Sequence, residues 1–230
     1  MLKPPRVRAF PSARTLILIA AVAATAGTGV AIAVANDWTG RFDEALLFLI
    51  RGSGAGGKPF GPLWFHEAVR DVTALGSMIV LAIVVLGATA YFMASARYRL
   101  ASLVLGSSLA ATAYSTALKV GFSRERPDIV DHGMATFTAS FPSGHALLSA
   151  AILLTNGGLL AFAARTRNER IVIGVAAVLL TTLVGLSRIF LGVHWPSDVI
   201  AGWLFGTVWA SLTLLLARTL YPQPPSLPYD

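Results

Sequence analysis

Six uncharged stretches constrain the fold of this chain more than any other feature of its sequence. Each lies between successive charged or histidine residues and has the roughly 17 to 25 residues that a membrane-spanning helix requires. They are residues 15–36, 72–96, 100–118, 146–164, 171–187 and 199–217. Their apolar residues are continuous rather than alternating, which argues against the strands of a barrel. The sequence therefore predicts an all-α, polytopic membrane protein in which six transmembrane helices form a helical bundle.

The composition excludes several other classes of protein. Only 13% of the residues are charged and the mean hydropathy is +0.69, whereas a soluble domain carries about 25% charged residues. The chain has no cysteine, which excludes disulfides and cysteine-based metal sites. Its net charge of +7 is not arranged in the basic stripe typical of nucleic-acid binding, so we expect no nucleic-acid partner and interpret the charge as topology and contact with anionic lipids.

The positions of the basic residues predict the orientation in the membrane. If the N-terminus is cytoplasmic, that side carries ten of the 18 lysines and arginines, in short segments close to helix ends, where the positive-inside bias acts. We expect one domain over 1–230 in the inner (cell) membrane, with residues 1–14 and 222–230 as cytoplasmic tails. An alternative for the first stretch is a signal peptide cleaved after 33–35, although the stretch is longer than the apolar core of most signal peptides.

Two local patterns predict structure outside the charged helix ends. Residues 41–51 (RFDEALLFLIR) have the pattern of a short amphipathic helix, which is either an interfacial helix or a plain connection between spans. Gly202 and Gly206 form a GxxxG pattern in the last span, which indicates a close helix-packing face.

Polar residues at several predicted helix ends fall on one face of the membrane. They are Lys119 at the end of the third span, Ser143 and His145 at the start of the fourth, Arg188 at the end of the fifth, and His194 and Asp198 at the start of the sixth. Because successive spans alternate in direction, all these ends lie on the extracytoplasmic face. A single boundary charge is usually an anchor that reaches the interface. So many on one face indicate a functional site.

The cations of this set suit a phosphate ligand. Lys119, Arg126 and Arg188 supply three positive charges, and the helix that starts at 142–145 offers backbone N–H groups and the positive end of its dipole. Gly144 has no side chain, so the backbone can approach the phosphate oxygens closely. Three fixed cations neutralise the transferring group without a metal ion, and no cluster of acidic metal ligands is found nearby. We therefore expect no metal and no cofactor.

The two histidines of the set suit different chemical roles. His194 and Asp198 are four residues apart, so the carboxylate can bind one ring nitrogen and leave the other nucleophilic. Pro196 between them suits the first turn of a helix. His145 has no close carboxylate in the sequence, and it suits a general acid that protonates the leaving oxygen and then a base for water.

Three motifs in this region resemble a known family. Residues 119–127 (KVGFSRERP) fit K-x6-R-P, residues 142–145 (PSGH) fit the second motif, and residues 187–198 (SRIFLGVHWPSD) fit S-R-x5-H-x3-D. In this order they resemble the signature of the type 2 phosphatidic acid phosphatase (PAP2) superfamily, which also includes the vanadium haloperoxidases. The six-span layout resembles the membrane-bound lipid phosphatase branch. The catalytic motifs then occupy residues 119–198.

The resemblance implies a role for each motif residue. His194 would become the phosphohistidine, Asp198 would orient it, and His145 would be the acid and base. The phosphate-binding residues would be Lys119, Arg126, Ser143, Gly144 and Arg188. The implied activity is hydrolysis of a lipid phosphomonoester or diphosphate. Undecaprenyl diphosphate, phosphatidate, phosphatidylglycerol phosphate and a lipid A phosphate all remain candidates, and residues 128–141 are where the preference could be set.

Two other functions use the same residues. A lipid phosphotransferase would pass the phosphoryl group from the phosphohistidine to another lipid instead of water. A non-catalytic lipid-phosphate binder or carrier would use only the cationic pocket. A vanadate-dependent peroxidase fits less well, because the peroxidases of this superfamily are soluble. The sequence identifies membrane lipid and the bilayer as partners and says nothing of oligomeric state.

Overall fold

The computed structural model describes residues 11–52, 59–130, 138–164 and 166–220, and every regular element in these ranges is a helix. The elements are α1 (Ala13–Ala35), α2 (Gly40–Arg51), α3 (Leu63–Ala74), α4 (Met78–Ala94), α5 (Tyr98–Phe122), α6 (Gly144–Ser149), the π-helical turn η2 (Ala150–Leu154), α7 (Thr155–Ala163), α8 (Arg167–Phe190) and α9 (Pro196–Leu220). The predicted all-α class is confirmed. Of the segments considered above, most of 1–14, all of 222–230 and half of 128–141 lie outside the described residues.

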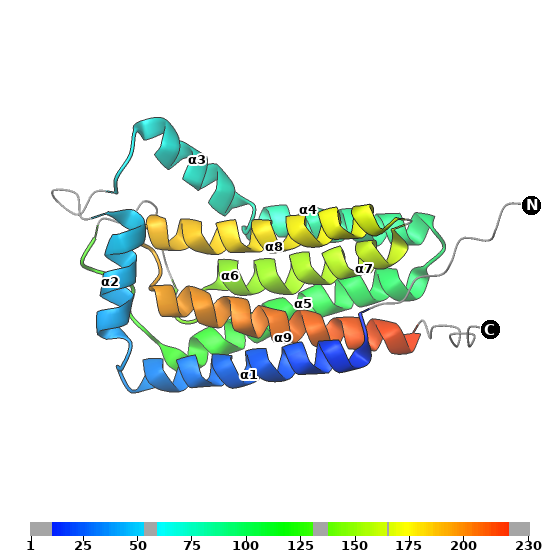
Figure 1. Ribbon diagram of the computed structural model, residues 1–230, viewed down its shortest axis with the longest axis horizontal. Helices are drawn as coiled ribbons and strands as arrows, with labels where there is room; N and C mark the ends of the chain where they lie inside the picture. The colour runs from blue at the N-terminus through cyan, green and yellow to red at the C-terminus, as the bar shows by residue number, and fades with distance from the viewer. Residues whose placement is uncertain (1–10, 53–58, 131–137, 165, 221–230) are drawn as a thin grey trace, which may run out of the picture.

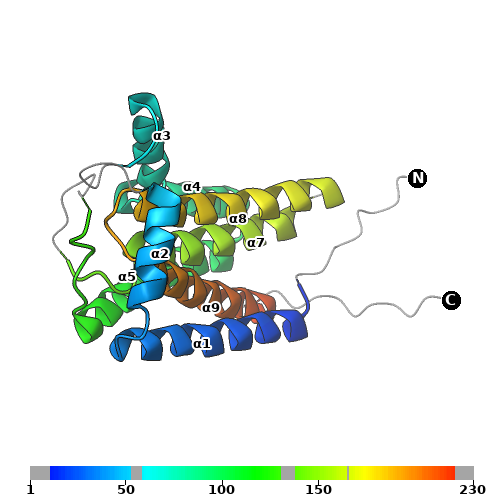
Figure 2. The ribbon, with the colours of Figure 1, turned by 60° about the vertical axis from the view of Figure 1, so that its left-hand side comes forward.

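Among the residues that the structure describes, five helical segments are long and apolar enough to cross a membrane: α1, α5, the continuous helix from α6 through η2 to α7, α8 and α9. They lie side by side as a bundle (Figure 1; Figure 2). Helices α3 and α4 make a sixth span if they are taken together, with a bend of 48° between them. By length and composition, the chain is a multi-pass helical membrane protein, with five to six spans in its described part.

The structure differs from the prediction within residues 72–96, which do not form one helix. Helix α3 ends at Ala74, and α4 starts after Ser77, whose hydroxyl oxygen accepts a hydrogen bond from the Val80 amide at 3.3 Å. Between them, Gly76 packs so closely that an added Cβ would overlap Val184 and lie 3.3 Å from Cδ2 of His145. The break therefore brings Gly76 against His145, a predicted site residue. The apolar pattern of the sequence could not show this contact.

Helix α2 lies across one end of the bundle (Figure 2). The amphipathic helix predicted over 41–51 is confirmed: Asp43, Leu47 and Arg51 recur every fourth residue and are all buried. Leu47 packs in a cluster with Val130 and other apolar residues of the bundle end. The buried face of α2 thus rests on the protein and carries two charged side chains, which is unusual unless they are paired.

Helices α6 and α9 pack closely through the predicted glycine pair. A Cβ atom on Gly206 would lie 2.5 Å from the carbonyl oxygen of Leu147, and Gly202 faces the first turn of α6 in the same way. The GxxxG prediction is confirmed, since small residues let two backbones approach. The same packing joins the starts of the two helices, where the Ser143 amide donates to the Asp198 carbonyl oxygen at 3.0 Å.

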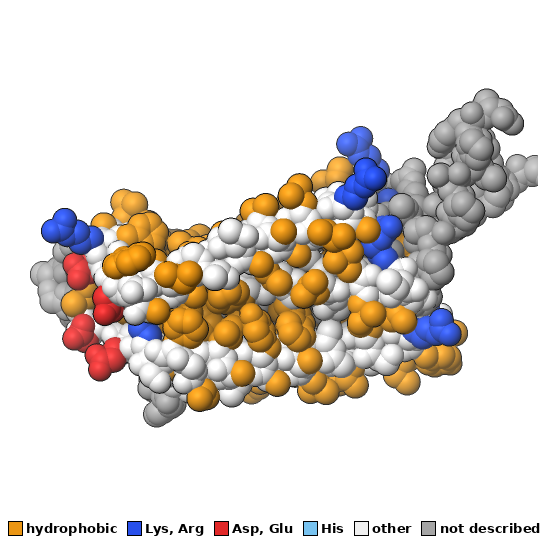
Figure 3. Space-filling view, turned by 90° about the horizontal axis from the view of Figure 1, so that it is seen from below, with side chains coloured by type: hydrophobic (Ala, Val, Ile, Leu, Met, Phe, Trp, Pro, Cys, Tyr) orange, Lys and Arg blue, Asp and Glu red, His pale blue; other side chains and the backbone are white. Residues whose placement is uncertain are grey.

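The charged side chains gather at the two ends of the bundle (Figure 3). On the face shown, acidic side chains gather at the end where α2 lies, and hydrophobic side chains cover the middle. The first helix begins and the last helix ends at the opposite end, where Nη1 of Arg218 donates to the carbonyl oxygen of Pro11 at 2.6 Å. This distribution is that of a protein with an apolar belt and two water-facing ends.

Candidate active site

The predicted site residues all lie where helices start or end, at the end of the bundle that α2 covers. Lys119 is in the last turn of α5, Arg126 follows that helix, Ser143 is the N-cap of α6, Gly144 and His145 open α6, Arg188 is in the last turn of α8, His194 precedes α9, and Asp198 is in its first turn. Pro196 is the first residue of α9. Residues far apart in the sequence therefore share one end of the bundle.

His194 is held on one side by Asp198. Both side chains are buried, with 2% and 0% of their surface exposed, and Nδ1 of His194 lies 3.5 Å from Oδ2 of Asp198. The same carboxylate oxygen accepts hydrogen bonds from the Ser140 hydroxyl at 2.5 Å and from the Trp195 amide at 2.9 Å. A carboxylate fixed by several donors stays ionised and keeps one orientation. Asp198 is therefore suited to orient the imidazole.

The other ring nitrogen of His194 faces a cation. Nη1 of Arg126 lies 3.2 Å from Nε2 of His194, and a guanidinium can only donate hydrogen bonds. Nε2 must then be the unprotonated nitrogen, and Nδ1 carries the proton and points to Asp198. Burial, with smaller contributions from Arg126 and Arg188, outweighs the opposing effect of Asp198 and lowers the pKa of His194 to about 3. The imidazole is thus neutral at neutral pH, with its lone pair beside Arg126.

The predicted phosphate-binding residues lie next to one another. Nζ of Lys119 donates to the Ala139 carbonyl oxygen at 2.8 Å, and a Cβ on Gly144 would lie 3.3 Å from Cε of Lys119. Gly144 therefore leaves room for the lysine. The Ser143 hydroxyl is fully buried and has no hydrogen-bond partner among the described residues. A buried hydroxyl without a partner is costly, and an oxyanion at this place would satisfy it.

Arg188 and His145 complete the group. Arg188 is 4% exposed, and its Nη1 donates to the hydroxyl of Thr73 at the end of α3 with a distance of 3.1 Å. His145 is half-buried and packs against Gly76 at the break after α3. It interacts electrostatically with the surrounding pocket residues, which are Arg188, His194, Lys119 and Arg126. The structure thus places both imidazoles in one cationic pocket.

Sequence reasoning missed several residues that hold this group, and Arg124 is the most prominent. Its guanidinium forms ion pairs with Asp198 at 2.6 Å and with Asp43 of α2 at 2.8 Å. Burial lowers the pKa of Arg124, but the two carboxylates outweigh burial and the net shift is upward. The position of Arg124, two residues before Arg126, is a sequence signal for a further cation beside the site. Nothing in the sequence pattern indicated Asp43.

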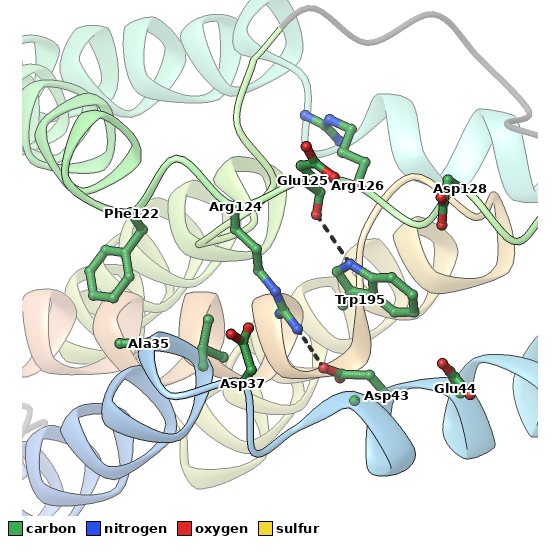
Figure 4. Close-up of a pocket in the computed structure, with 12 residues that line it drawn as sticks. Ala35, Asp37, Asp43, Glu44, Phe122, Arg124, Glu125, Arg126, Asp128 and Trp195 are labelled. Carbon is green, nitrogen blue, oxygen red and sulfur yellow. Dashed lines mark hydrogen bonds and ion pairs between the residues drawn. The ribbon is translucent and has the colours of Figure 1, made fainter.

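A cavity of about 450 Å³ opens beside Arg124 and Arg126 (Figure 4). Five acidic residues are among those that line it, namely Asp37, Asp43, Glu44, Glu125 and Asp128. Trp195 also lines it and donates from Nε1 to the carbonyl oxygen of Glu125 at 3.1 Å. Within the described ranges, no three His, Asp or Glu side chains form a group that could hold a metal ion.

The chain is similar in sequence to one family of known proteins. A family model described as the PAP2 superfamily matches residues 99–222. Phosphatidylglycerophosphatase B of Bacillus subtilis (strain 168) is 31% identical over 153 residues, which are 62% of this chain and 70% of that protein. An undecaprenyl-diphosphatase of Sulfolobus acidocaldarius is 40% identical over 84 residues, which are 35% of this chain and 34% of that protein.

The fold is also found in a solved structure. The crystal structure of a transmembrane PAP2 type phosphatidylglycerolphosphate phosphatase from Bacillus subtilis superposes with a TM-score of 0.75 at 21% sequence identity, covering 91% of this chain and 98% of that chain. At this level of identity the likeness concerns the fold, including its membrane-spanning helices.

Proposed function

The chain belongs to the PAP2 superfamily and is a membrane lipid phosphatase, and from this premise we propose that it hydrolyses its substrate through a phosphohistidine at His194, without a metal ion. One observation carries the proposal. Nδ1 of the buried His194 faces Asp198 and Nε2 faces Arg126, so the nucleophilic lone pair points to the place where a phosphate would neutralise the cations.

The proposed reaction has two steps. Nε2 of His194 attacks phosphorus, the bond to the lipid oxygen or to the diphosphate bridge breaks, and His145 donates a proton to the leaving oxygen. His145 then takes a proton from water as the water oxygen attacks phosphorus, the P–N bond breaks, and inorganic phosphate leaves. Throughout, the charge on the phosphoryl oxygens is balanced by Lys119, Arg126 and Arg188, with hydrogen bonds from Ser143 and the Gly144 backbone.

The substrate we propose is a membrane lipid whose chain lies in the bilayer while its phosphate head occupies the pocket. Two relatives are named for different head groups, phosphatidylglycerol phosphate and undecaprenyl diphosphate. The shared feature is the lipid-linked phosphate, and we propose that class as the substrate. We place the site on the extracytoplasmic face of the inner membrane and both termini in the cytoplasm. Support comes from the basic residues at the end opposite the site, which include Arg14, Arg97, Arg99, Arg167, Arg170 and Arg218.

A panel of lipids tests the proposal. Purified protein in mixed micelles is given phosphatidate, phosphatidylglycerol phosphate, undecaprenyl diphosphate and lipid A in turn, and inorganic phosphate is measured. We expect release from at least one lipid, an acid-labile and alkali-stable labelled protein with a ³²P-labelled lipid, and loss of both in His194→Asn. Label transferred to a second lipid instead of water would indicate a phosphotransferase. Tight binding of all these lipids with no turnover would indicate a carrier and would reject the proposal.

A further inference from the structure

We propose that Arg124 and Asp43 are positioning residues that hold Asp198, and through it His194, in the reactive orientation. The inference rests on the proposed function, because it assigns a role in activating the same histidine. Arg124 occupies a position that the first motif leaves unspecified, and Asp43 lies outside all three motifs. Arg124 pairs with Asp43 of helix α2, which lies across the end of the bundle (Figure 4), and with Asp198 in the first turn of α9.

The contacts of Arg124 bridge two buried carboxylates. Its Nη1 donates to Oδ1 of Asp198 at 2.6 Å and to the Ser197 hydroxyl at 2.8 Å. Its Nη2 donates to Oδ2 of Asp43 at 2.8 Å and to the Thr39 hydroxyl at 3.0 Å. Both Nη atoms are thus engaged with protein groups. The side chain therefore acts on the oxygen of Asp198 that does not face the histidine.

Asp43 fixes the far end of this chain of charges. Its carboxylate is 0% exposed, and it accepts hydrogen bonds from the Ser197 amide at 2.8 Å and from the Ser197 hydroxyl at 2.7 Å. The first turn of α9 is therefore tied to α2. Two turns further along α2, Nη1 of Arg51 donates to the carbonyl oxygen of Phe190 at 3.0 Å. Helix α2 thus holds both ends of the segment that carries His194.

Charge alternates along the path from Asp43 to His194, and this makes the role testable. A carboxylate beside an imidazole favours its protonated form, and a cation beside that carboxylate weakens the effect. Loss of the Arg124 charge leaves the negative charge of Asp198 uncompensated, which should raise the pKa of His194. Loss of the Asp43 charge should lower the pKa of His194, because the positive charge of Arg124 then acts on Asp198 alone. Displacement of the histidine by itself would not produce two opposite effects.

Other charged groups surround His194 and stay constant in this comparison. They come from the segments packed around it and are Arg126 from the connection after α5, Arg188 from α8, Lys119 from α5 and His145 from α6. Because the substitutions leave these groups in place, the difference between two variants reports on the path through Asp198.

The test compares Arg124→Gln and Asp43→Asn, with phosphatidate or the best lipid of the panel as substrate. We expect kcat to fall about 10- to 100-fold in Arg124→Gln, as for the partners that orient metal-bound histidines, with KM within about twofold because Arg124 does not face the phosphate. The acidic limb of the kcat/KM profile, which reports the free enzyme's base, should move up by about one pH unit in Arg124→Gln and down in Asp43→Asn.

Two further variants control for folding and charge. Glu67→Gln changes an exposed acid of α3 that does not line the cavity beside Arg124 and should keep the wild-type kcat and profile. Arg124→Lys keeps the positive charge and should return the acidic limb toward the wild-type position, which tests the proposal even if Asp43→Asn fails to fold. Thermal unfolding in detergent identifies variants that do not fold.

Several outcomes would overturn the positioning role. One is wild-type kcat in folded Arg124→Gln. Another is an acidic limb that moves in the same direction in Arg124→Gln and Asp43→Asn, or that moves in neither variant. A lower kcat without opposite shifts of the acidic limb would reflect a structural defect. Failure of the proposed function gives a different result: His194→Asn would keep turnover or no phosphohistidine would form, whatever the behaviour of the Arg124 variants.

Discussion

Gly202 of α9 lies directly against the backbone of Ser143: a Cβ atom at position 202 would come within 2.8 Å of the Ser143 carbonyl oxygen. That carbonyl accepts the first hydrogen bond of α6, from the Leu147 amide at 2.9 Å. The contact therefore sets the position of the α6 start relative to α9, which carries Asp198. One glycine serves both the packing of two helices and the geometry of the residues proposed to bind phosphate.

Substitution of this glycine should affect stability and activity together. We expect Gly202→Ala to lower the free energy of unfolding by about 1–3 kcal/mol, as overpacking does, and to lower kcat/KM about 10- to 100-fold because the phosphate-binding residues shift. Gly174→Ala is the matched control: its Cβ would have nothing within 4 Å, and it should gain up to about 1 kcal/mol from helix propensity. Thermal unfolding and phosphate release measure both. Equal behaviour of the two variants would contradict the packing argument.

Substitution of His145 should trap the covalent intermediate. His145→Asn removes the base for water, so we expect turnover to fall about 10²- to 10⁴-fold while His194 still reacts with an activated substrate. The measurement is the amount of acid-labile ³²P on the protein after addition of ³²P-labelled acetyl phosphate. Acetate leaves this substrate with little help from a general acid. More label is expected in His145→Asn than in the wild type. Equal or lower labelling would argue that His145 does not act on the water molecule.

Stability should fall as the pH is lowered from neutrality. The pKa of His194 is about 3 in the folded protein and 6.5 in the unfolded chain, so between these values only the unfolded chain binds the proton. The contribution is fully present above pH 6.5 and is lost as the pH falls toward 3, with a loss of about 3 kcal/mol by pH 4.5. As the pH is lowered, the unfolding temperature in detergent should therefore drop less steeply for His194→Gln than for the wild type. Parallel curves for wild type and variant would contradict the assignment.

Activity should persist when metal ions are removed. Lys119, Arg126 and Arg188 supply the positive charge that a metal would otherwise bring to the phosphoryl oxygens, so we expect kcat in excess EDTA to equal that in buffer. Arg126→Gln should lose activity in both conditions. Restoration of the EDTA-treated wild type by added Mg²⁺ would show that the three cations do not suffice.

The sequence alone determined the class of the fold and the motif residues. Apolar runs between charges specify membrane-spanning helices because a helix in lipid satisfies its own backbone groups. The spacing of His194 and Asp198 is local, so their contact follows from a helical start at Pro196. These features depend on a few neighbouring positions, and the sequence shows neighbours directly.

Only the tertiary structure decided which distant groups hold the site. Asp43 meets Ser197, a partner 154 positions away in the sequence, because α2 crosses the end of the bundle. Gly76 meets His145 because the chain breaks between α3 and α4. Local periodicity carries no information on such contacts, since they depend on how whole helices pack. In the sequence, Asp43 and Arg51 also look like the polar face of a surface helix. The structure buries both, Asp43 against Arg124 and Arg51 against the carbonyl oxygen of Phe190.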